Sequence, residues 1–465
     1  MTSIEQSGRE TWRSIVLDQH RSQIVVMAHK TSPTFCLPSV EIPRWERIAE
    51  NLTEAVRQAW HCDAICLFTP TLVPSIDSDN PHYEVMECLR PLRTDSSCVQ
   101  VPIQGLTRDS FHDEADFLML HRALAELDSY ANDACAPFVQ VGWFRELQNW
   151  VAEAIRPRHL RLSGSFYQLN ASPSFSLVRF ETNGPDVWFK AVGKPNLREF
   201  PITVELARLF PSYLPEIIGQ KPKWNAWLCL SAGSTMLAQV CDVSSWRDAA
   251  TALARLQIES VDQVGAILNA GARDLRLQRL SEAAEPFFVA MRMVMREAHS
   301  LREALSREEL RLLCIQVRDS ITLLEDLKVS DALGHLDLNP ANIVLSQSRC
   351  ILLDWADAYV GHPFISFQYL LEHFKREVGS AADLQSGPLA AYSQVWQEFL
   401  TSDLISKTME QSRLVAAFAY AASLFGWHDE TKLRRPEVAR SLASMVRRMN
   451  REANELRGHA ALCRD

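Results

Sequence analysis

Three polar side chains that can do chemistry lie close together in the sequence: Asp337, Asn342 and Asp354. Segment 343–353 has an apolar run at each end and the polar residues 346–349 in between, which predicts a β-hairpin. Because partners across a hairpin lie only about 4.5 to 5.5 Å apart, we expect Asn342 to face Asp354 at its open end. One amide and one carboxylate suit Mg²⁺, which takes hard oxygen ligands and completes its shell with water and phosphate. Asp337 precedes the hairpin in a loop that contains a proline, where its carboxylate can accept a proton from an alcohol.

The residues around this hairpin follow a recognisable order. The chain reads H-L-D-L-N-P-A-N over 335–342 and L-L-D-W-A-D-A-Y-V-G-H-P over 352–363. This order resembles the aminoglycoside phosphotransferase and choline kinase family, which usually reads H-G-D-x-H-P-x-N, then an apolar hairpin, then I-D-[WF]-x-[DE]-A and G-x-P. Three residues depart from the pattern, since Leu336, Asn339 and Ser366 stand where the family has Gly, His and Asp. A plain hairpin with Asp and Asn as turn residues is the alternative, and the ordered set argues against it.

The resemblance covers about residues 155–465 and implies a bilobal kinase-like fold of the α+β class. A small antiparallel β lobe is expected over 155–235 and a helical lobe over 236–465. The apolar spacing supports this division, because it predicts a strand at 227–230 and helices from 243 to 329 and from 364 to 457. The segment 231–234 is then the expected hinge between the lobes.

The resemblance also implies an activity. It indicates a kinase that transfers the γ-phosphoryl group of ATP or GTP, with Mg²⁺, to a hydroxyl of an unidentified small molecule. Asp337 is then the catalytic base, and Asn342 and Asp354 hold the metal. Because fold alone does not imply activity, a catalytically inactive nucleotide sensor or partner-binding protein is the alternative. A kinase that acts on proteins is disfavoured, since no F-G pair and no A-P-E segment follow Asp354.

A kinase-like site also needs a lysine that holds the nucleotide phosphates. A β-prone run ends in Lys190, and the turn 182–186 joins this run to a strand over 175–180. A lysine in this role is normally aligned by a glutamate of the next helix, and the sequence offers Glu199 and Glu205. The Arg-Glu pair that ends at Glu199 resembles the Arg-Glu pair of the family and favours Glu199, while Glu205 stays open.

A second nucleotide-binding element is expected in the turn at 169–174. Its residues Ser172 and Ser174 flank a proline, and the turn can present backbone N–H groups and hydroxyls to phosphate oxygens. A polar hairpin turn without a ligand is the alternative. The position before Lys190 and the resemblance to the Ser-Pro turn of aminoglycoside phosphotransferases favour phosphate binding.

Other residues near the hairpin are assigned structural roles. We expect His335 to bond to backbone near the loop and Trp355 to pack in the core. Asp357 is expected to cap a helix rather than to serve as a second metal ligand. For His362 the sequence gives no partner.

The composition limits the class of partner. With 465 residues and 47% hydrophobic content, the chain can form two or three domains with real cores. A net charge of −9 offers no basic field for nucleic acid and fits a cationic or neutral small substrate better. The longest apolar stretch, 414–427, is too short to span a membrane. Eleven scattered cysteines without a C-x-x-C pair and a polar N-terminus without a secretory signal predict free thiols in the cytoplasm. The oligomeric state stays open.

Residues 1–150 fall outside the resemblance. Their patterns predict a small α/β or α+β domain, with strands at 24–27, 64–68 and 83–88, a helix over 45–60 and a connecting helix over 144–157. The helix at 45–60 faintly resembles a Nudix helix but lacks its glycine and its paired carboxylates, so its glutamates are interpreted as surface charge. We therefore treat this part as an accessory domain of unknown role.

Overall fold

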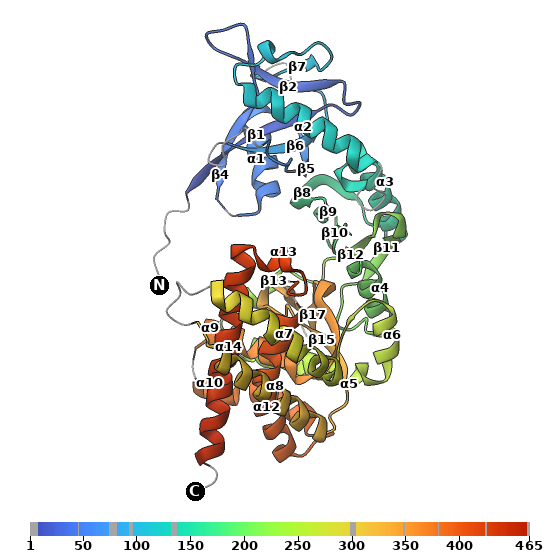
Figure 1. The fold of residues 1–465 in the computed structure, drawn as a ribbon. Coiled ribbons are helices and arrows are strands. Elements are labelled where there is room, and N and C mark those ends of the chain that lie inside the picture. The colour runs from blue at the N-terminus through green and yellow to red at the C-terminus, as the bar shows by residue number, and fades with distance from the viewer. Residues whose placement is uncertain are drawn as a thin grey trace. The chain divides into compact units, whose positions relative to one another are not determined.

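The computed structural model describes residues 8–44, 46–73, 81–92, 96–131, 137–297, 304–346, 349–379, 381–423 and 426–462. The chain forms two compact units, one of Met1–Phe200 with Glu216–Ser231 and the other of Pro201–Pro215 with Ala232–Asp465. Each unit combines strands and helices (Figure 1), so the predicted α+β class is confirmed. No described helix is both long and apolar enough to cross a membrane.

The first unit contains two sheets. The N-terminal sheet and its helices are β1 (Arg9–Leu17), β2 (Gln23–Ala28), β3 (Phe35–Cys36), β4 (Ser39–Pro43), α1 (Ile48–Trp60), β5 (Ala64–Phe68), β6 (His82–Cys88), β7 (Val99–Pro102), η1 (Arg108–Ser110), α2 (Glu114–Ala131), η2 (Pro137–Val139), α3 (Trp143–Ile155) and η3 (Arg156–Arg158). The second sheet follows with β8 (Leu162–Ser172), β9 (Phe175–Thr182), β10 (Val187–Val192), β11 (Ile217–Lys221), η4 (Pro222–Trp224) and β12 (Ala226–Leu230). Between β10 and β11, helix α4 (Glu199–Leu209) begins in this unit and belongs to the second unit from Pro201 onward.

Strand β1 lies inside the N-terminal sheet, whose order is β3-β2-β1-β6-β5. It pairs antiparallel with β2 and β4 and parallel with β6. The sequence predicted β2, β5, β6 and α1 but missed β1, because the first half of β1 is polar. Within that half, Arg13 is held by ion pairs of 2.6 Å to Asp113 and 2.5 Å to Asp116. Its charge is therefore compensated in a partly buried position.

Helix α1 packs on one face of this sheet with an apolar stripe. Ala49, Leu52, Val56 and Trp60 are buried at helical spacing. Glu54 lies on the opposite face and pairs with Arg57 over 2.6 Å, three residues on. The prediction that the glutamate charge of this helix is surface charge is confirmed for Glu54.

The second sheet, of order β11-β12-β10-β9-β8, has two different faces. Val178, Phe180, Phe189 and Leu228 point to the first face and are buried in one hydrophobic cluster with residues of the N-terminal sheet. Side chains alternate between the faces of a strand, so Lys190, next to Phe189, lies on the other face. The sheet therefore packs on the N-terminal region with one face and presents Lys190 on the opposite one.

Helix α3 joins the two sheets and packs against the second. The ring of Phe144 lies 4.5 Å from that of Phe166 and 5.9 Å from that of Phe180, and the ring of Trp143 lies 5.8 Å from that of Phe189. Burial of one such side chain stabilises the fold by about 1.5–3 kcal/mol. The predicted connecting helix is thus part of the core of the first unit.

The second unit is built mainly from helices, with two small three-stranded sheets. Its elements are β13 (Thr235–Met236), η5 (Leu237–Gln239), α5 (Val243–Ser260), η6 (Val261–Gln263), α6 (Val264–Asn269), β14 (Arg273–Leu275), α7 (Leu277–Glu297), α8 (Arg307–Asp326), β15 (Ala332–His335), η7 (Pro340–Asn342), β16 (Ile343–Ser346), β17 (Arg349–Leu352), η8 (Trp355–Asp357), β18 (Ala358–Gly361), α9 (Phe364–Glu377), α10 (Ala381–Ser386), α11 (Pro388–Trp396), α12 (Ser402–Ser423), α13 (Glu430–Leu433) and α14 (Pro436–Leu462). The helical pattern expected from 243 to 329 is interrupted by β14, which pairs with β18.

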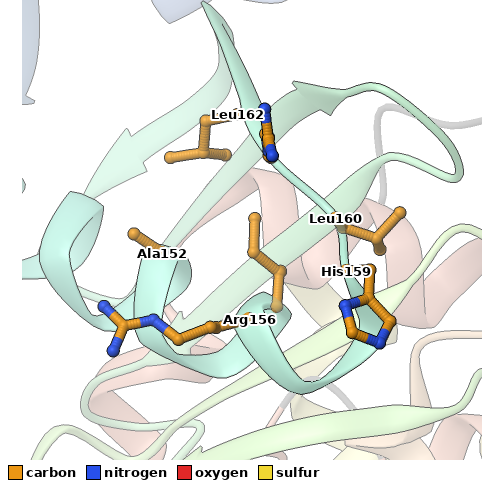
Figure 2. Close-up of a pocket in the computed structure, with 7 residues that line it drawn as sticks. Ala152, Arg156, His159, Leu160 and Leu162 are labelled. Carbon is orange, nitrogen blue, oxygen red and sulfur yellow. The ribbon is translucent and has the colours of Figure 1, made fainter.

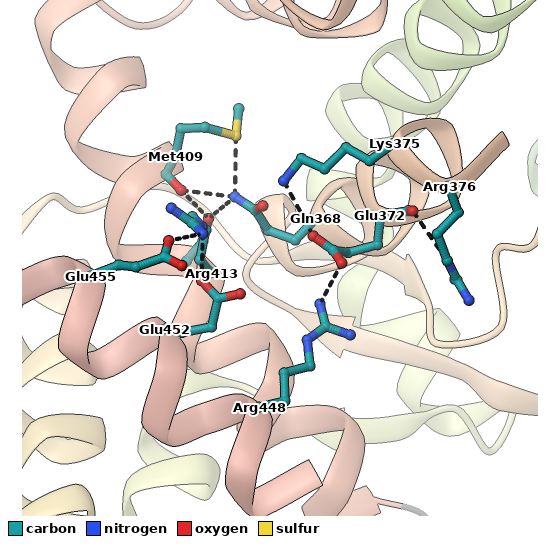
Figure 3. Close-up of polar contacts among 10 residues, drawn as sticks. Gln368, Glu372, Lys375, Arg376, Met409, Arg413, Arg448, Glu452 and Glu455 are labelled. Carbon is teal, nitrogen blue, oxygen red and sulfur yellow. Dashed lines mark hydrogen bonds and ion pairs between the residues drawn. The ribbon is translucent and has the colours of Figure 1, made fainter. Parts of the chain in front are cut away.

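Polar contacts hold α9, α12 and α14 together (Figure 3). From α9, Nε2 of Gln368 donates to the backbone oxygen of Met409 over 2.7 Å. Arg413 of α12 lies 2.7 Å from Glu452 of α14, and Arg448 of α14 lies 3.5 Å from Glu372 of α9. These contacts fix the helix that begins directly after β18.

The buried His362 lies between β18 and α9. Its Nδ1 accepts a hydrogen bond from the backbone N–H of Phe364 over 3.3 Å, which gives this histidine a partner that the sequence did not reveal. Burial lowers the pKa of His362 to about 3 from its ordinary value of 6.5. Protonation therefore favours the unfolded chain, and the stability that His362 contributes is complete above pH 6.5 and is lost as the pH falls toward 3.

The substitution His362→Asn tests this pH dependence, since Asn keeps an acceptor but takes up no proton. Between pH 7 and pH 5 we expect the variant to lose about 2 kcal/mol less unfolding free energy than the wild type. Urea denaturation at both pH values measures the difference. An equal loss in both proteins would show that His362 is not neutral in the native state.

Candidate active site

The loop after β15 holds the carboxylate of Asp337 between two amide side chains. Nδ2 of Asn339 donates to Oδ1 of Asp337 over 3.1 Å, and Nδ2 of Asn342 donates to Oδ2 over 3.2 Å. Nδ2 of Asn342 also donates to the backbone oxygen of Asp337 over 2.9 Å. The carboxylate is thereby fixed in one orientation, as a positioned general base requires.

Asn339 has a second role in this loop. Its Oδ1 accepts from the backbone N–H of Ala341, and its backbone oxygen accepts from the N–H of Asn342, each over 2.9 Å. Pro340 occupies the first position of η7, where its lack of an N–H costs no hydrogen bond. The sequence noted Asn339 only as a departure from the family pattern, whereas the structure gives it the work of shaping the loop and orienting Asp337.

The amide of Asn342 offers an oxygen ligand. Both hydrogen bonds of its Nδ2 go to Asp337, and no hydrogen bond to its Oδ1 is made within the described part of the chain. A hard cation can therefore use this oxygen. Among the described residues no three His, Cys, Asp or Glu side chains gather as a metal cluster. An amide and a carboxylate fit Mg²⁺, which obtains its remaining ligands from water and phosphate.

His335 connects the loop of Asp337 to the segment that carries Asp354. Its Nδ1 accepts from the backbone N–H of Asp337 over 3.1 Å, and its Nε2 lies 3.0 Å from the backbone oxygen of Leu353. Nε2 must then carry the proton. Burial lowers the pKa of His335 and favours this neutral form. His335 thus bonds to backbone on both sides, as the sequence predicted.

The backbone of His335 is held in turn by α9. Its N–H donates to Oγ of Ser366 over 2.8 Å, and the hydroxyl of Tyr359 lies 2.9 Å from the same oxygen. A Cβ atom on Gly334 would lie 2.0 Å from the ring of Tyr359, so only glycine fits beside it. Ser366 stands where the family pattern has Asp, and its hydroxyl supplies an acceptor to the backbone of His335, next to the loop of Asp337.

The hairpin pairs one residue away from the predicted register. Ile343 pairs with Leu352, and the backbone oxygen of Asn342 accepts from the N–H of Leu353 over 2.8 Å. The expectation that Asn342 lies opposite Asp354 is therefore wrong. One register runs unbroken from Ile343 with Leu352 to Ser346 with Arg349, and it places Asn342 opposite Leu353. Residues 347 and 348 of the expected turn lie outside the described residues.

Asp354 follows the hairpin in a left-handed backbone conformation, with φ at 61°. This region is uncommon for residues other than glycine, and such residues cluster at functional sites. The conformation turns the chain from β17 into η8. It supports a special role for Asp354 independently of the motif.

The neighbours of Asp354 have structural roles. Trp355 is buried, and its Nε1 donates to the backbone oxygen of Leu352 over 3.1 Å. Asp357 lies 2.8 Å from Arg273, and its backbone oxygen accepts from the N–H of Leu336. Neither observation favours Asp357 as a second metal ligand.

Lys190 forms a buried ion pair in the first unit. Its Nζ lies 2.6 Å from Oε1 of Glu199, and the side chains are only 16% and 3% exposed. The rings of Phe175 and Trp227 lie on either side, with centroids 6.0 and 5.9 Å from Nζ. Glu199 is the first residue of α4, and this position brings its carboxylate to the end of β10.

Glu205, the other glutamate that the sequence offered, points elsewhere. It pairs with Arg208 one helical turn later over 2.6 Å. The Arg208 guanidinium lowers the pKa of this carboxyl group. Of the two glutamates, Glu199 is therefore the one beside Lys190.

The turn at Ser172 and Ser174 joins β8 to β9. The two hydroxyl oxygens lie 2.9 Å apart, and Oγ of Ser172 accepts from the backbone N–H of Phe175 over 3.2 Å. The backbone oxygen of Ser174 accepts from the N–H of Gly193 over 2.8 Å, directly after the strand of Lys190. The turn is thus well ordered and tied to β10, and phosphate binding there stays a prediction.

Two tyrosines that the sequence did not single out lie near Asp337. Tyr369 of α9 and Tyr420 of α12 stack with ring centroids 5.6 Å apart, and both line a cavity of about 20 Å³ beside His335. Burial raises the pKa of both tyrosines, and the charge of Asp337 adds to the shift. The signal in the sequence was the spacing of Tyr369 and His373, one turn apart on a largely apolar helix.

A larger groove of the first unit lies beside the start of β8 (Figure 2). It has a volume of about 460 Å³ and is lined by apolar side chains and by Arg156, His159 and Arg161. It adjoins the start of β8, whereas Ser172 ends that strand. The groove is therefore separate from the turn of Ser172 and Ser174.

The ion pair of Lys190 can be tested by its effect on stability. Glu199→Ala removes the buried carboxylate that lies 2.6 Å from Nζ of Lys190, and we expect a loss of about 3–5 kcal/mol of unfolding free energy. Urea denaturation measures it. The matched control Glu205→Ala removes a partly exposed carboxylate from the same helix, where it pairs with the exposed Arg208, and should leave the midpoint nearly unchanged. Equal midpoints for the two variants would contradict a buried pair.

A match to a protein family includes the residues of the motif. Residues 205–399 match the model of the phosphotransferase enzyme family named APH. No curated protein sequence matches the chain. Among solved structures, the chain is similar to the macrolide 2′-phosphotransferase MphH of Brachybacterium faecium, with 14% identity, 64% of this chain and 96% of that chain covered, and a TM-score of 0.44. It is also similar to a choline/ethanolamine kinase family protein of Mesorhizobium loti, with 13% identity, 67% of this chain and 94% of that chain covered, and a TM-score of 0.44. A third similar structure is an ethanolamine kinase of Plasmodium vivax, with 11% identity, 75% of this chain and 96% of that chain covered, and a TM-score of 0.46. The residues that match the phosphotransferase enzyme family model, 205–399, contain Asp337, Asn342 and Asp354, in agreement with the resemblance of the motif.

Proposed function

We propose that this protein is a kinase that transfers the γ-phosphoryl group of ATP or GTP to a hydroxyl of a small molecule. The observation that carries the proposal is the carboxylate of Asp337, held by the amides of Asn339 and Asn342 in the family-matched region. A fixed carboxylate beside an amide oxygen suited to a cation is the arrangement that phosphoryl transfer to an alcohol requires.

Each proposed residue has one task. Asp337 orients the acceptor hydroxyl and takes its proton at a carboxylate oxygen. Oδ1 of Asn342 and the carboxylate of Asp354 hold Mg²⁺, which supplies neutralisation of the charge on the phosphates when it is bound. Lys190, aligned by Glu199, holds phosphate oxygens of the nucleotide.

The turn with Ser172 and Ser174 is proposed to offer N–H and hydroxyl groups to the same phosphates. In support of this, the backbone oxygen of Ser174 accepts from the N–H of Gly193, which lies three residues after Lys190. The turn is therefore tied to the strand that carries Lys190.

The side of Asp337 that faces Tyr369 and Tyr420 is proposed to receive the acceptor. His373 lies on the same helix as Tyr369, with ring centroids 5.0 Å apart, and burial lowers the pKa of His373. The charge of Asp337 acts on all three side chains. Aromatic faces beside a carboxylate suit an acceptor with a cationic or a sugar-like group. A panel of amino alcohols, sugars and aminoglycosides therefore covers the relevant chemistry.

The substitution Asp337→Asn separates chemistry from nucleotide binding. We expect kcat to fall by about 10²–10⁴-fold, because Asn has no basic oxygen. Nucleotide affinity should change by less than about twofold, since Asp337 is not assigned to the nucleotide. Steady-state kinetics with an accepted acceptor and a fluorescence titration with nucleotide measure the two effects. Normal turnover in this variant would show that the proposed base is wrong.

The substitution Asp354→Asn gives the complementary result. We expect the nucleotide to bind at least about tenfold more weakly when Mg²⁺ is present, because one charged ligand is lost. Without Mg²⁺, the variant and the wild type should bind alike. Asp357→Asn is the matched control, because its carboxylate is paired with Arg273. If only the control lost Mg²⁺-dependent nucleotide binding, Asp357 and not Asp354 would be the metal ligand.

A thermal-shift titration with ATP and GTP, each with Mg²⁺, tests whether the protein binds a nucleotide at all. We expect one of the nucleotides to raise the melting temperature, because binding to the folded state alone stabilises it, and at least one acceptor of the panel to be phosphorylated. Binding without turnover across the panel would instead favour the nucleotide sensor.

A further inference from the structure

Strand β8 is bonded to the N-terminal sheet through one side chain. Oε1 of Gln168 accepts from the backbone N–H of Cys66, and Nε2 of Gln168 donates to the backbone oxygen of Cys66, each over 2.8 Å. Gln168 is only 1% exposed. A side-chain amide that satisfies both backbone groups of one residue imitates a neighbouring strand.

Cys66 offers these groups because β5 is the last strand in its sheet. In the order β3-β2-β1-β6-β5, no strand among the described residues pairs with the second edge of β5. Buried backbone groups that find no partner cost about 1–3 kcal/mol each. Gln168 therefore closes an edge that would otherwise be unsatisfied.

The register of β8 explains how Gln168 reaches this edge. Phe166 pairs with Phe180 and Gln168 with Val178, but after an irregularity between Gln168 and Asn170 the next pairs are Asn170 with Leu177 and Ala171 with Ser176. Because β8 has one extra residue at this irregularity, Ala171 lies on the same face of the sheet as Gln168, although the two are three residues apart. Phe166, Gln168 and Ala171 therefore all lie on the face that packs on the N-terminal region. Bulges of this kind redirect side chains next to functional sites.

The end of β8 is held on the same side. Ala171 packs against the hydrophobic cluster of α1 and the N-terminal strands. The next residue, Ser172, starts the turn whose Ser174 bonds to Gly193. The turn therefore lies between two attachments, one to the N-terminal region through Gln168 and Ala171 and one to β10 through Gly193.

We propose that the N-terminal region positions the turn of Ser172 and Ser174 for the nucleotide, and that Gln168 is the positioning residue that transmits this constraint. The inference rests on the proposed function for its nucleotide, and it gives the N-terminal region a task in nucleotide binding. Gln168 touches neither nucleotide nor acceptor in this scheme. It acts by fixing β8, and β8 fixes the turn.

The test uses the full chain with Gln168→Leu, which keeps the size of the side chain but leaves both backbone groups of Cys66 unpaired. We expect amide hydrogen exchange in the peptide 172–175 to be at least about tenfold faster, because local opening costs less when an attachment is lost. With Mg·ATP or Mg·GTP, whichever the wild type uses, we expect KM to rise about tenfold and kcat to stay within about twofold.

A matched control separates positioning from general loss of stability. Val26→Ala removes buried apolar groups from β2, whose strand partners are β1, β3 and β7. Its melting temperature should fall, while exchange in 172–175 and KM stay at the values of the wild type. If both variants change exchange and KM alike, the effect is general softening and the proposal is overturned.

The outcomes also distinguish this inference from the proposed function. If the wild type binds neither nucleotide, the proposed function fails, and hydrogen exchange alone decides the attachment: unchanged exchange in Gln168→Leu overturns it and faster exchange supports it. If the wild type binds nucleotide but Gln168→Leu leaves KM unchanged, the positioning role is overturned while the proposed function stands.

Discussion

The candidate site of the second unit depends on one buried imidazole. His335 has one nitrogen that accepts and one that donates, and both are occupied by backbone groups of the two segments that carry Asp337 and Asp354. Protonation would place a second donor against the N–H of Asp337. The burial that keeps the ring neutral is therefore also what keeps the proposed base and metal ligand on neighbouring segments.

Helix α9 holds His335 in place. Ser366 accepts from the backbone of His335, and further along the same helix Gln368 bonds to α12 and Glu372 pairs with Arg448 of α14. A site held by one loop is in this way anchored in a three-helix core (Figure 3). Catalytic groups on rigid elements are placed more accurately than groups on free loops.

Local patterns predicted much of this fold, and long-range contacts explain the rest. The hairpin of β16 and β17 and the strand of Lys190 follow from short apolar runs with turn residues between them, which is information held within a few neighbours. The predicted register of the hairpin was wrong by one residue, because the short apolar runs fix the pairing of the strands only to within a residue and the structure pairs Ile343 with Leu352. The choice of Glu199 over Glu205 required the start of α4, and such boundaries are the least certain part of a sequence-based assignment.

Other parts had no local signal at all. The polar start of β1 forms a strand because Arg13 finds two carboxylates on another part of the chain about a hundred residues away. The bonds between Gln168 and Cys66 join residues equally far apart. An amide side chain within a strand looks the same in the sequence whether it faces water or replaces a missing strand.

The two-faced sheet of β8 to β12 has a consequence for how such a chain can be inherited. One face carries Lys190, but the other, with Val178, Phe180 and Phe189, is buried against described residues that precede β8 in the chain. A recombination event that cut the gene between α3 and β8 would produce a protein in which this apolar face is exposed and prone to aggregation. Selection against such breakpoints would keep the two regions as a single heritable block.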